Sequence, residues 1–489
     1  MSGALVPIIA LTLLGGTWGC SGGTTTAGEV LPGRSRPLLE HQWPHPRDLR
    51  LAATSFERPD DRAALVTTAS GVRGYVLSDA DERVVQIVAA APFGRMSEQP
   101  GEAGAAELLS RLVAAQIQER LGPDPGARMQ VEQDPDLTRV MLTCLSDAWP
   151  KGLAAVIGGL RDVRIDATST GAFRTGPGFA RTTRNLGGAA FRPAVELAGM
   201  TAAWPIAPPA ADLTVSPEAI RALAARTLRP DTVVLGIGGG FARTEAERSL
   251  QTATEGWRVA PVTATAVQPV AVPARPARFR AIEEPGFTTW IAVGHAVGMI
   301  DPADEAAVAV MTDVVNIRLN IAIREIRGLA NQAVLQVPAT THPGLLHVRS
   351  GARPESVAPV VHFALQELSK IREATGLPTD DELEQVKGGL VLGRWQGSLD
   401  GPRAAVATYA VEAARHGTLE RLARWPDVVR AVTASAVQTA AAKYIQPDRM
   451  ATVMIGQVDA ARKARHPRWP ITFDELQARF GSPRSQARR

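Results

Sequence analysis

One unit occurs twice in this sequence, and the spacing of the copies limits the folds open to the chain. The stretch 216–239 can be laid on the stretch 433–456 without a gap, so that Pro230-Asp231 falls on Pro447-Asp448. Each copy begins with a hydroxyl residue suited to cap a helix, continues as a helix, turns at Pro-Asp and ends as a strand running into glycine. Such a match at the ends of two halves of similar size indicates that a whole domain was duplicated.

Length and composition agree with a globular protein of at least two domains. The chain has 489 residues, enough for two sizeable cores. Lys and Arg (53) barely exceed Asp and Glu (49), which gives a formal net charge of +4. No run of basic residues interleaved with aromatic residues occurs, so we expect no nucleic-acid partner.

The first residues predict export. Residues 1–19 are apolar from Ala4 to Leu14, which is too short to span a bilayer as a helix but suits the core of a signal peptide. Cys20 follows Gly19 and opens a flexible tether, 20–50. This arrangement resembles a bacterial lipoprotein signal, which implies that Cys20 carries the lipid and anchors the chain in the outer membrane, on the periplasmic side of the cell envelope. The alternative is ordinary secretion with cleavage nearby.

Cys144 is the one other cysteine of the chain. It lies in the strand-like run 139–145, where a lone thiol usually behaves as a small buried hydrophobe. With Cys20 used for the lipid, we expect no intramolecular disulfide.

The remaining sequence alternates between strand-like and helix-like segments. The predicted strands are 75–77, 84–91, 140–145, 233–237 and 330–337, and the predicted helices are 103–121, 149–160, 216–228 and 301–326. Segment 168–188 shows no regular pattern, and segment 259–278, rich in Pro, Val and Ala, predicts a stiff linker. We therefore expect an N-terminal half at 51–258, a C-terminal half at 279–480 and a basic tail at 481–489.

The stretch 321–334 reads I-A-I-R-E-I-R-G-L-A-N-Q-A-V, and Gly328 in it is a plausible helix stop. A helix, then R-E-x-R-G-L-A, then a strand resembles the C-terminal half of the pitrilysin/insulinase family of zinc peptidases, including its processing-peptidase and core-protein branch. The resemblance extends from about Leu51 to Phe480. It implies an α+β fold of two similar halves, each an antiparallel sheet covered by helices, that close like a clamp around a peptide-binding chamber.

The same resemblance places a metal site that this sequence lacks. Active members carry His-x-x-Glu-His on the first long helix, where two histidines on one helix face bind zinc and the glutamate activates the metal-bound water. Here Gly104-Ala105-Ala106 matches the family's lead-in to the motif. Glu107 and Arg111 then occupy the places of the two histidines, and Ser110 occupies the place of the glutamate. Arg111 has no lone pair to donate, and Ser110 cannot replace a carboxylate base.

No other residue replaces the missing ligands. The stretch 168–195, which should supply a further carboxylate, contains no Asp, Glu or His, and His45 is the one histidine between residues 42 and 289. We therefore expect no catalytic residue, no metal ligand and no cofactor, and instead an ion pair between Glu107 and Arg111 across one helical turn.

Two other patterns resemble functional sites. Gly236-Ile-Gly-Gly-Gly follows a predicted strand, but it lacks the Walker lysine and the full dinucleotide spacing, and the repeat explains it as the end of a half. Single histidines without acidic or cysteine neighbours favour packed residues over ligands; these are His295, His342, His347 and His362.

The resemblance also implies one peptide contact. In the family's peptidases an arginine of the C-terminal half and a tyrosine seven residues later help to hold the substrate backbone. Arg324 matches the arginine, whereas Asn331 occupies the place of the tyrosine. For Arg324 a salt bridge or a helix-end contact is an equally good interpretation.

These observations predict a non-catalytic subunit that forms a heterodimer with an active homologue and helps to build a chamber for a peptide or protein substrate. Zinc is expected in the active partner alone. A stand-alone clamp that binds peptides or proteins at the cell envelope is one alternative. An active metallopeptidase with an atypical site is another, for which the sequence offers no residues.

The lipoprotein signal generates the first testable prediction. The mature protein should begin at Cys20 and carry a lipid on its thiol, because the apolar segment ends in Gly-Cys and a structureless stretch follows. Mass spectrometry of the mature N-terminus measures this. An unmodified Cys20, or cleavage elsewhere, would leave secretion but remove the anchor.

Overall fold

The computed structural model describes residues 58–123, 126–175, 192–201, 215–259 and 278–480. The predictions for the signal peptide, Cys20, the tether and the basic tail therefore lie outside the described residues, as does nearly all of the linker 259–278. The described residues form one compact unit by their contacts.

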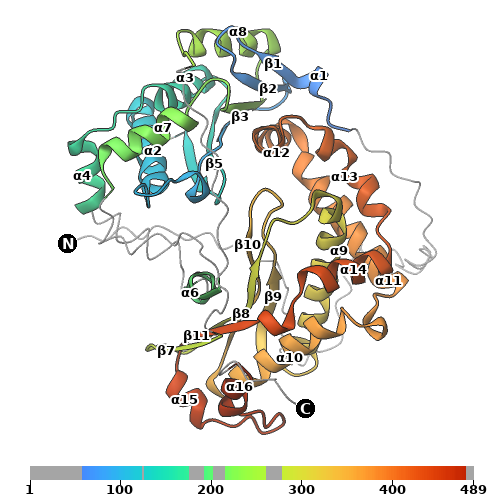
Figure 1. Cartoon of the computed structure of the whole chain (residues 1–489). Coiled ribbons are helices and arrows are strands. Elements are labelled where there is room, and N and C mark those ends of the chain that lie inside the picture. The colour runs from blue at the N-terminus through green and yellow to red at the C-terminus, as the bar shows by residue number, and fades with distance from the viewer. Residues whose placement is uncertain (1–57, 124–125, 176–191, 202–214, 260–277, 481–489) are drawn as a thin grey trace, which may run out of the picture. The chain divides into compact units, whose positions relative to one another are not determined.

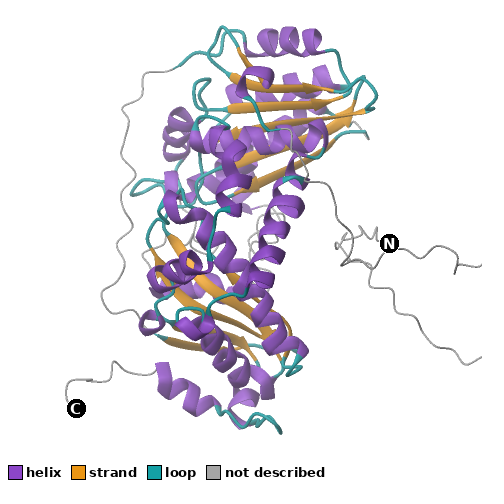
Figure 2. Cartoon of the chain, turned by 90° about the vertical axis from the view of Figure 1, so that its right-hand side faces the viewer, coloured by secondary structure: helices purple, strands orange, loops and turns teal. Residues whose placement is uncertain are grey.

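Two sheets organise the described residues, and they share the order of five strands, to which the first sheet adds β1 at its edge (Figures 1 and 2). The first sheet has the order β1-β2-β6-β3-β5-β4, and the second has the order β7-β11-β8-β10-β9. In each, the strand from the repeat, β6 or β11, pairs parallel with one neighbour and antiparallel with the other. The strands are β1 (Leu65–Thr67), β2 (Arg73–Ser78), β3 (Val84–Ala91), β4 (Arg128–Gln133), β5 (Thr138–Leu145), β6 (Val234–Gly239), β7 (Phe279–Glu283), β8 (Thr289–Val297), β9 (Ala330–Gln336), β10 (Gly344–Ala352) and β11 (Ala451–Gly456).

The structure confirms the internal repeat residue by residue. Helix α7 (Pro217–Thr227) and β6 in the first half correspond, without a shift, to α14 (Ala434–Tyr444) and β11 in the second. Both helices have the predicted cap: the Ser216 side chain accepts a hydrogen bond from the Ala219 amide, and the Thr433 side chain accepts one from the Ala436 amide, each at 3.2 Å. The predicted fold class, two similar α+β halves, is thereby confirmed.

Helices cover one face of each sheet and enclose its core (Figure 1). In the first half, apolar side chains of α2, α3, α7 and α8 pack on Ile87, Leu142 and Ile237 of the sheet. The described α-helices of the first half are α1 (Asp61–Ala64), α2 (Ala105–Leu121), α3 (Trp149–Arg161), α4 (Ala167–Thr175), α6 (Arg192–Thr201), α7 and α8 (Arg243–Thr254). Those of the second half are α9 (Glu305–Leu319), α10 (Val357–Lys370), α11 (Asp380–Gly388), α12 (Gly401–His416), α13 (Glu420–Arg430), α14, α15 (Val458–Lys463) and α16 (Phe473–Phe480).

Each half contributes one helix to the sheet of the other half. Helix α6 of the first half packs on β8, β10 and β11 of the second sheet, where Leu197 is fully buried against Ala292, Ala451 and Val453. Helix α12 of the second half packs on β2, β3 and β6 of the first sheet, and its Val406 is fully buried. Each sheet thus has its second face covered by a helix from the other half of the sequence.

Glycines of β6 permit the close approach of α12. A Cβ added to Gly236 would lie 2.5 Å from the Val406 carbonyl oxygen, and one added to Gly238 would lie 2.2 Å from the Pro402 carbonyl oxygen. Both distances are shorter than van der Waals contact allows. The Gly236-Ile-Gly-Gly-Gly stretch is therefore a buried strand that accommodates a helix, in agreement with its interpretation as the end of a half rather than a phosphate loop.

Two local structures differ from the prediction. The stretch expected to lack a pattern contains α4, whose start is capped by Asp166 and Ser169, each accepting a hydrogen bond from the amide of the other at 2.7 and 3.0 Å. The helix expected over 301–326 is α-helical as far as Leu319 and π-helical over Asn320–Glu325. Gly328 ends it with φ +61°, the left-handed conformation predicted for a helix stop.

The glycine packing generates a stability prediction. Gly238→Ala should lower the free energy of unfolding by about 1–3 kcal/mol, because the new methyl group must displace the α12 backbone. The control is Gly388→Ala near the end of α11, where no atom lies within 4 Å of the added Cβ. That variant should be stabilised by up to about 1 kcal/mol, since alanine favours a helix. Urea unfolding measures both, and equal stabilities would refute the role of Gly238.

Candidate functional site

The segment at the family's metal motif is an ion-paired part of α2. The Arg111 Nη2 atom lies 2.5 Å from the Glu107 Oε1 atom, and the two side chains are 14% and 6% exposed. The Ser110 hydroxyl donates to the Glu107 carbonyl at 2.8 Å. The ion pair predicted for Glu107 and Arg111 is therefore present, and it is mostly buried.

This arrangement is unsuited to a divalent cation. A zinc ion needs ligands with lone pairs converging on one point, and the guanidinium of Arg111 offers none. Its positive charge, already in contact with Glu107, would also repel a metal at that carboxylate. Within the described ranges, no group of three or more His, Cys, Asp or Glu residues could hold a metal ion.

The histidines of the second half are packed residues. His295 on β8 is buried, with Nδ1 2.9 Å from the Ala296 carbonyl oxygen and Nε2 accepting the Gln446 amide at 3.0 Å. Burial lowers its pKa, so the ring is neutral near pH 7. Burial lowers the pKa of His347 on β10 to about 4, with the same result. His362 packs edge-on against Phe363, in line with its prediction as a packed side chain.

The two residues predicted to contact peptide are both exposed. Arg324 lies in the π-helical turn after α9, and its side chain is 60% exposed. Its Nε atom lies 3.4 Å from Glu325 Oε1, an exposed pair that contributes little stability. Asn331 lies exposed on β9, at the edge of the second sheet. The salt bridge predicted as the alternative role of Arg324 is therefore present, but it is exposed and involves only the Nε atom of the guanidinium.

A polar network that the sequence did not predict joins the two halves. Arg415 of α12 lies 2.7 Å from Asp134 and 2.9 Å from Asp136, and the Thr341 hydroxyl donates to Asp136 at 2.7 Å. Burial raises the pKa of the Asp136 carboxyl, but the hydrogen bonds from Arg415 and Thr341 outweigh it and hold the pKa below its ordinary value. The buried His342 follows directly, with Nδ1 2.8 Å from the Pro343 carbonyl oxygen. No sequence pattern links these residues, because the two aspartates lie more than 200 positions before Thr341 and Arg415.

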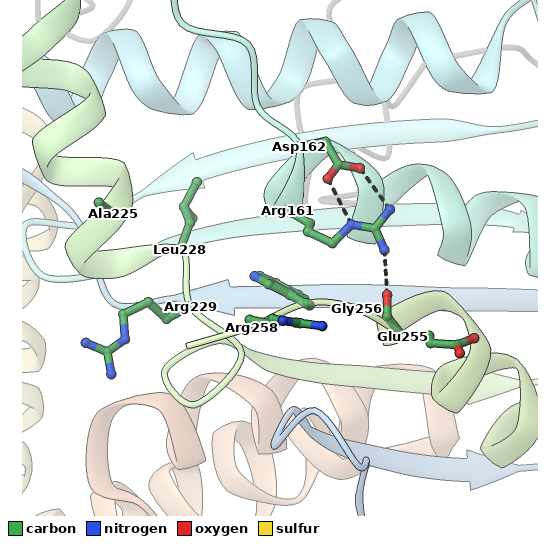
Figure 3. A pocket seen from close by; sticks show the side chains of 9 residues that line it. Arg161, Asp162, Ala225, Leu228, Arg229, Glu255, Gly256 and Arg258 are labelled. Atoms are coloured by element: carbon green, nitrogen blue, oxygen red, sulfur yellow. Dashed lines mark hydrogen bonds and ion pairs between the residues drawn. The ribbon is translucent and has the colours of Figure 1, made fainter. Parts of the chain in front are cut away.

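The described residues also line a pocket of about 520 Å³, at the C-terminal ends of α3 and α7 and beside the loop after α8 (Figure 3). Arg161 donates to both carboxylate oxygens of Asp162 at 2.9 Å and to the Glu255 carbonyl at 3.1 Å. Arg229 pairs with Asp231 at 2.6 Å. Arginines at helix C-termini donate hydrogen bonds to free carbonyls and interact favourably with the negative end of the helix dipole. We therefore interpret Arg161 and Arg229 as residues that stabilise the fold.

Comparison with known proteins gives a family match and a fold match. Residues 214–390 match the family model described as the peptidase M16 inactive domain. None of the curated proteins matches the chain. Among solved structures, the peptidase M16 inactive domain from Pseudomonas fluorescens is 20% identical, with 82% of this chain and 98% of that chain covered and a TM-score of 0.65.

Two further structures share the fold at lower identity. A protease from Helicobacter pylori is 14% identical, with 80% of this chain and 98% of that chain covered and a TM-score of 0.67. A chain of complex III2 from Candida albicans is 10% identical, with 81% and 96% covered and a TM-score of 0.62. At these identities the likeness establishes the fold.

The buried ion pair on α2 generates a prediction. Arg111→Met should destabilise the protein by about 3–5 kcal/mol, because it leaves the carboxylate of Glu107 buried without its partner. The double variant Glu107→Leu with Arg111→Met should recover most of that loss, since it removes both charges. Unfolding free energies of the two single variants and the double variant measure the coupling. Additive effects would show that the two side chains do not depend on each other.

Proposed function

We propose that this chain is a non-catalytic subunit of the peptidase M16 family, whose inactive-domain model matches residues 214–390, and that it pairs with an active zinc peptidase homologue. The family is the pitrilysin/insulinase family indicated by the R-E-x-R-G-L-A stretch. In the proposed pair, this chain forms one wall of the peptide-binding chamber and the partner alone carries zinc.

The observation that carries the proposal is the ion pair between Glu107 and Arg111. Hydrolysis by this family needs a metal-bound water and a carboxylate to take its proton. At the matching positions of this chain, the Arg111 guanidinium pairs with the Glu107 carboxylate, and the Ser110 hydroxyl donates a hydrogen bond to a backbone carbonyl of its own helix. A chain that keeps the whole fold but has an arginine in place of a ligand is suited to hold a peptide rather than cleave it.

The pairing is supported by the use of the fold elsewhere and by the exposure of Arg324. A chain of complex III2 from Candida albicans has this fold. Arg324 keeps its guanidinium in solvent, where it can donate hydrogen bonds to peptide carbonyls. With a lipid on Cys20, the pair would be held at the periplasmic side of the cell envelope.

A stand-alone peptide-binding clamp is the competing function. Purification from the native membrane in mild detergent distinguishes the two. A stoichiometric partner with an intact His-x-x-Glu-His motif is the result expected for a subunit. The chain alone, or as a homodimer with bound peptide, is the result expected for a clamp and would overturn the pairing.

The proposal predicts that the purified chain contains no stoichiometric zinc and cleaves no peptide. Ser110→Glu alone should restore nothing, because a general base cannot act without a metal-bound water. Metal analysis by mass spectrometry and a peptidase assay with and without chelator measure this. One zinc per chain with chelator-sensitive cleavage would refute the proposal.

A second prediction concerns peptide contact by Arg324. Arg324→Ala in the purified pair should raise KM roughly ten- to a hundredfold, because a charge-assisted hydrogen bond contributes about 1.5–3 kcal/mol. Asn331→Tyr should lower KM, by restoring the aromatic residue that accompanies the arginine in the family's peptidases. Steady-state kinetics of the pair measure both. Unchanged kinetics together with a lower Tm of the Arg324→Ala variant would show that Arg324 serves the fold.

A further inference from the structure

The π-helical turn that carries Arg324 leaves one carbonyl without its usual donor. The Ile326 amide donates to the Ile321 carbonyl at 2.9 Å, five residues back along the chain. In an α-helix this amide would serve Ala322, four residues back. The Ala322 carbonyl instead accepts a hydrogen bond from the Nη1 atom of Arg327 at 2.6 Å. A side chain just beyond the turn thus supplies the bond that the wider turn removes.

Aromatic rings from distant parts of the sequence hold that guanidinium. The Arg327 Cζ atom lies 3.9 Å from the ring centroid of Phe363 on α10 and 5.1 Å from that of Trp469. The two rings meet edge to face, with centroids 5.3 Å apart and an interplanar angle of 86°. An arginine over an aromatic face is attracted by the ring quadrupole. The position of the guanidinium therefore depends on the packing of α10 and of the segment before α16.

The end of the helix is fixed by a second set of bonds. The Gly328 amide donates to the Arg324 carbonyl at 2.9 Å, and the Leu329 amide donates to the Ile323 carbonyl at 2.9 Å. This is a Schellman-type ending in which each hydrogen bond spans one residue more than usual, as a π-helical last turn requires. The Arg324 carbonyl is thus held by the Gly328 amide, while the Arg324 side chain is mostly exposed.

We propose that Arg327 is a positioning residue, which stabilises the π-helical turn and so directs Arg324 toward bound peptide. The assignment of peptide as the ligand rests on the proposed function, whereas the support of the turn by Arg327 does not. Arg327 itself does not contact the substrate in this proposal. It acts through the Ala322 carbonyl.

Amide hydrogen exchange on the full-length protein tests the proposal without any ligand. Arg327→Met keeps the apolar stem over Phe363 but removes the donor, so the amides of Ile326, Gly328 and Leu329 should exchange at least about tenfold faster. Arg327→Lys retains a cation and a donor and should restore part of the protection. Amides of β6, in the other half, should be unchanged.

The matched control is Arg462→Met. Arg462 also lies over a phenylalanine ring, that of Phe473 at 4.6 Å, but it donates to the Gln477 side chain rather than to a helix carbonyl. Its loss should leave exchange at 326–329 unchanged even where Tm falls. If Arg327→Met leaves those amides protected, Arg327 contributes packing alone and the proposal is wrong. If Arg327→Met does not fold, Phe363→Leu provides the same test by loosening the guanidinium.

Kinetics of the purified pair separate this proposal from the proposed function. Faster exchange in Arg327→Met together with a raised KM, rescued by Arg327→Lys, supports both. Faster exchange with KM unchanged in both Arg327→Met and Arg324→Ala supports the stabilised turn and refutes peptide contact. A KM raised by Arg327→Met without any change in exchange refutes positioning through the turn.

Discussion

The exchange of helices between the halves is the packing on which the rest of the structure depends. A sheet whose strands are apolar on both faces needs a cover on each, and β6 and β11 are buried at every position. In each half, helices of that half cover one face. The other face is covered by α6 or α12, each contributed by the opposite half. Helix α12 approaches so closely that it leaves no room for a Cβ at Gly236 or Gly238. Around this contact lie the edge-to-face pair of Tyr75 and Tyr409 and the bonds of Arg415 to the first half.

Under the proposed function, the packing of α2 explains how a peptidase fold can persist without peptidase chemistry. The residues of α2 that pack on the sheet are apolar and fully buried, whereas the residues at the motif positions lie on another side of the helix. Glu107 and Arg111 satisfy each other there, so the helix retains its place without a metal ion to neutralise its polar side chains. Fold and chemistry are thus carried by different faces of one helix, and one can be lost while the other remains.

Sequence reasoning succeeded where the signal was local and failed where it depended on distance. The repeat placed α7, α14, β6 and β11 correctly because capping residues, apolar spacing and terminal glycines all lie within 24 positions. Helix α4 was missed because its cap, Asp166 with Ser169, precedes a segment without apolar periodicity. The π-helical turn has the same apolar spacing as an α-helix, so the pattern could not reveal it. The helix exchange and the Arg415 network unite residues hundreds of positions apart, which a single sequence does not connect.

The burial of Cys144 has a consequence for a chain proposed to be exported. Its side chain is 2% exposed on β5, with the sulfur directed at the Val85 carbonyl at 3.9 Å. Thiol–disulfide exchange requires a thiolate that a second sulfur can reach, and burial in apolar surroundings removes both conditions. Once the chain is folded, Cys144 would therefore be inert toward thiol–disulfide exchange. Incorrect pairing with another thiol would be confined to the interval between translocation and closure of the first sheet.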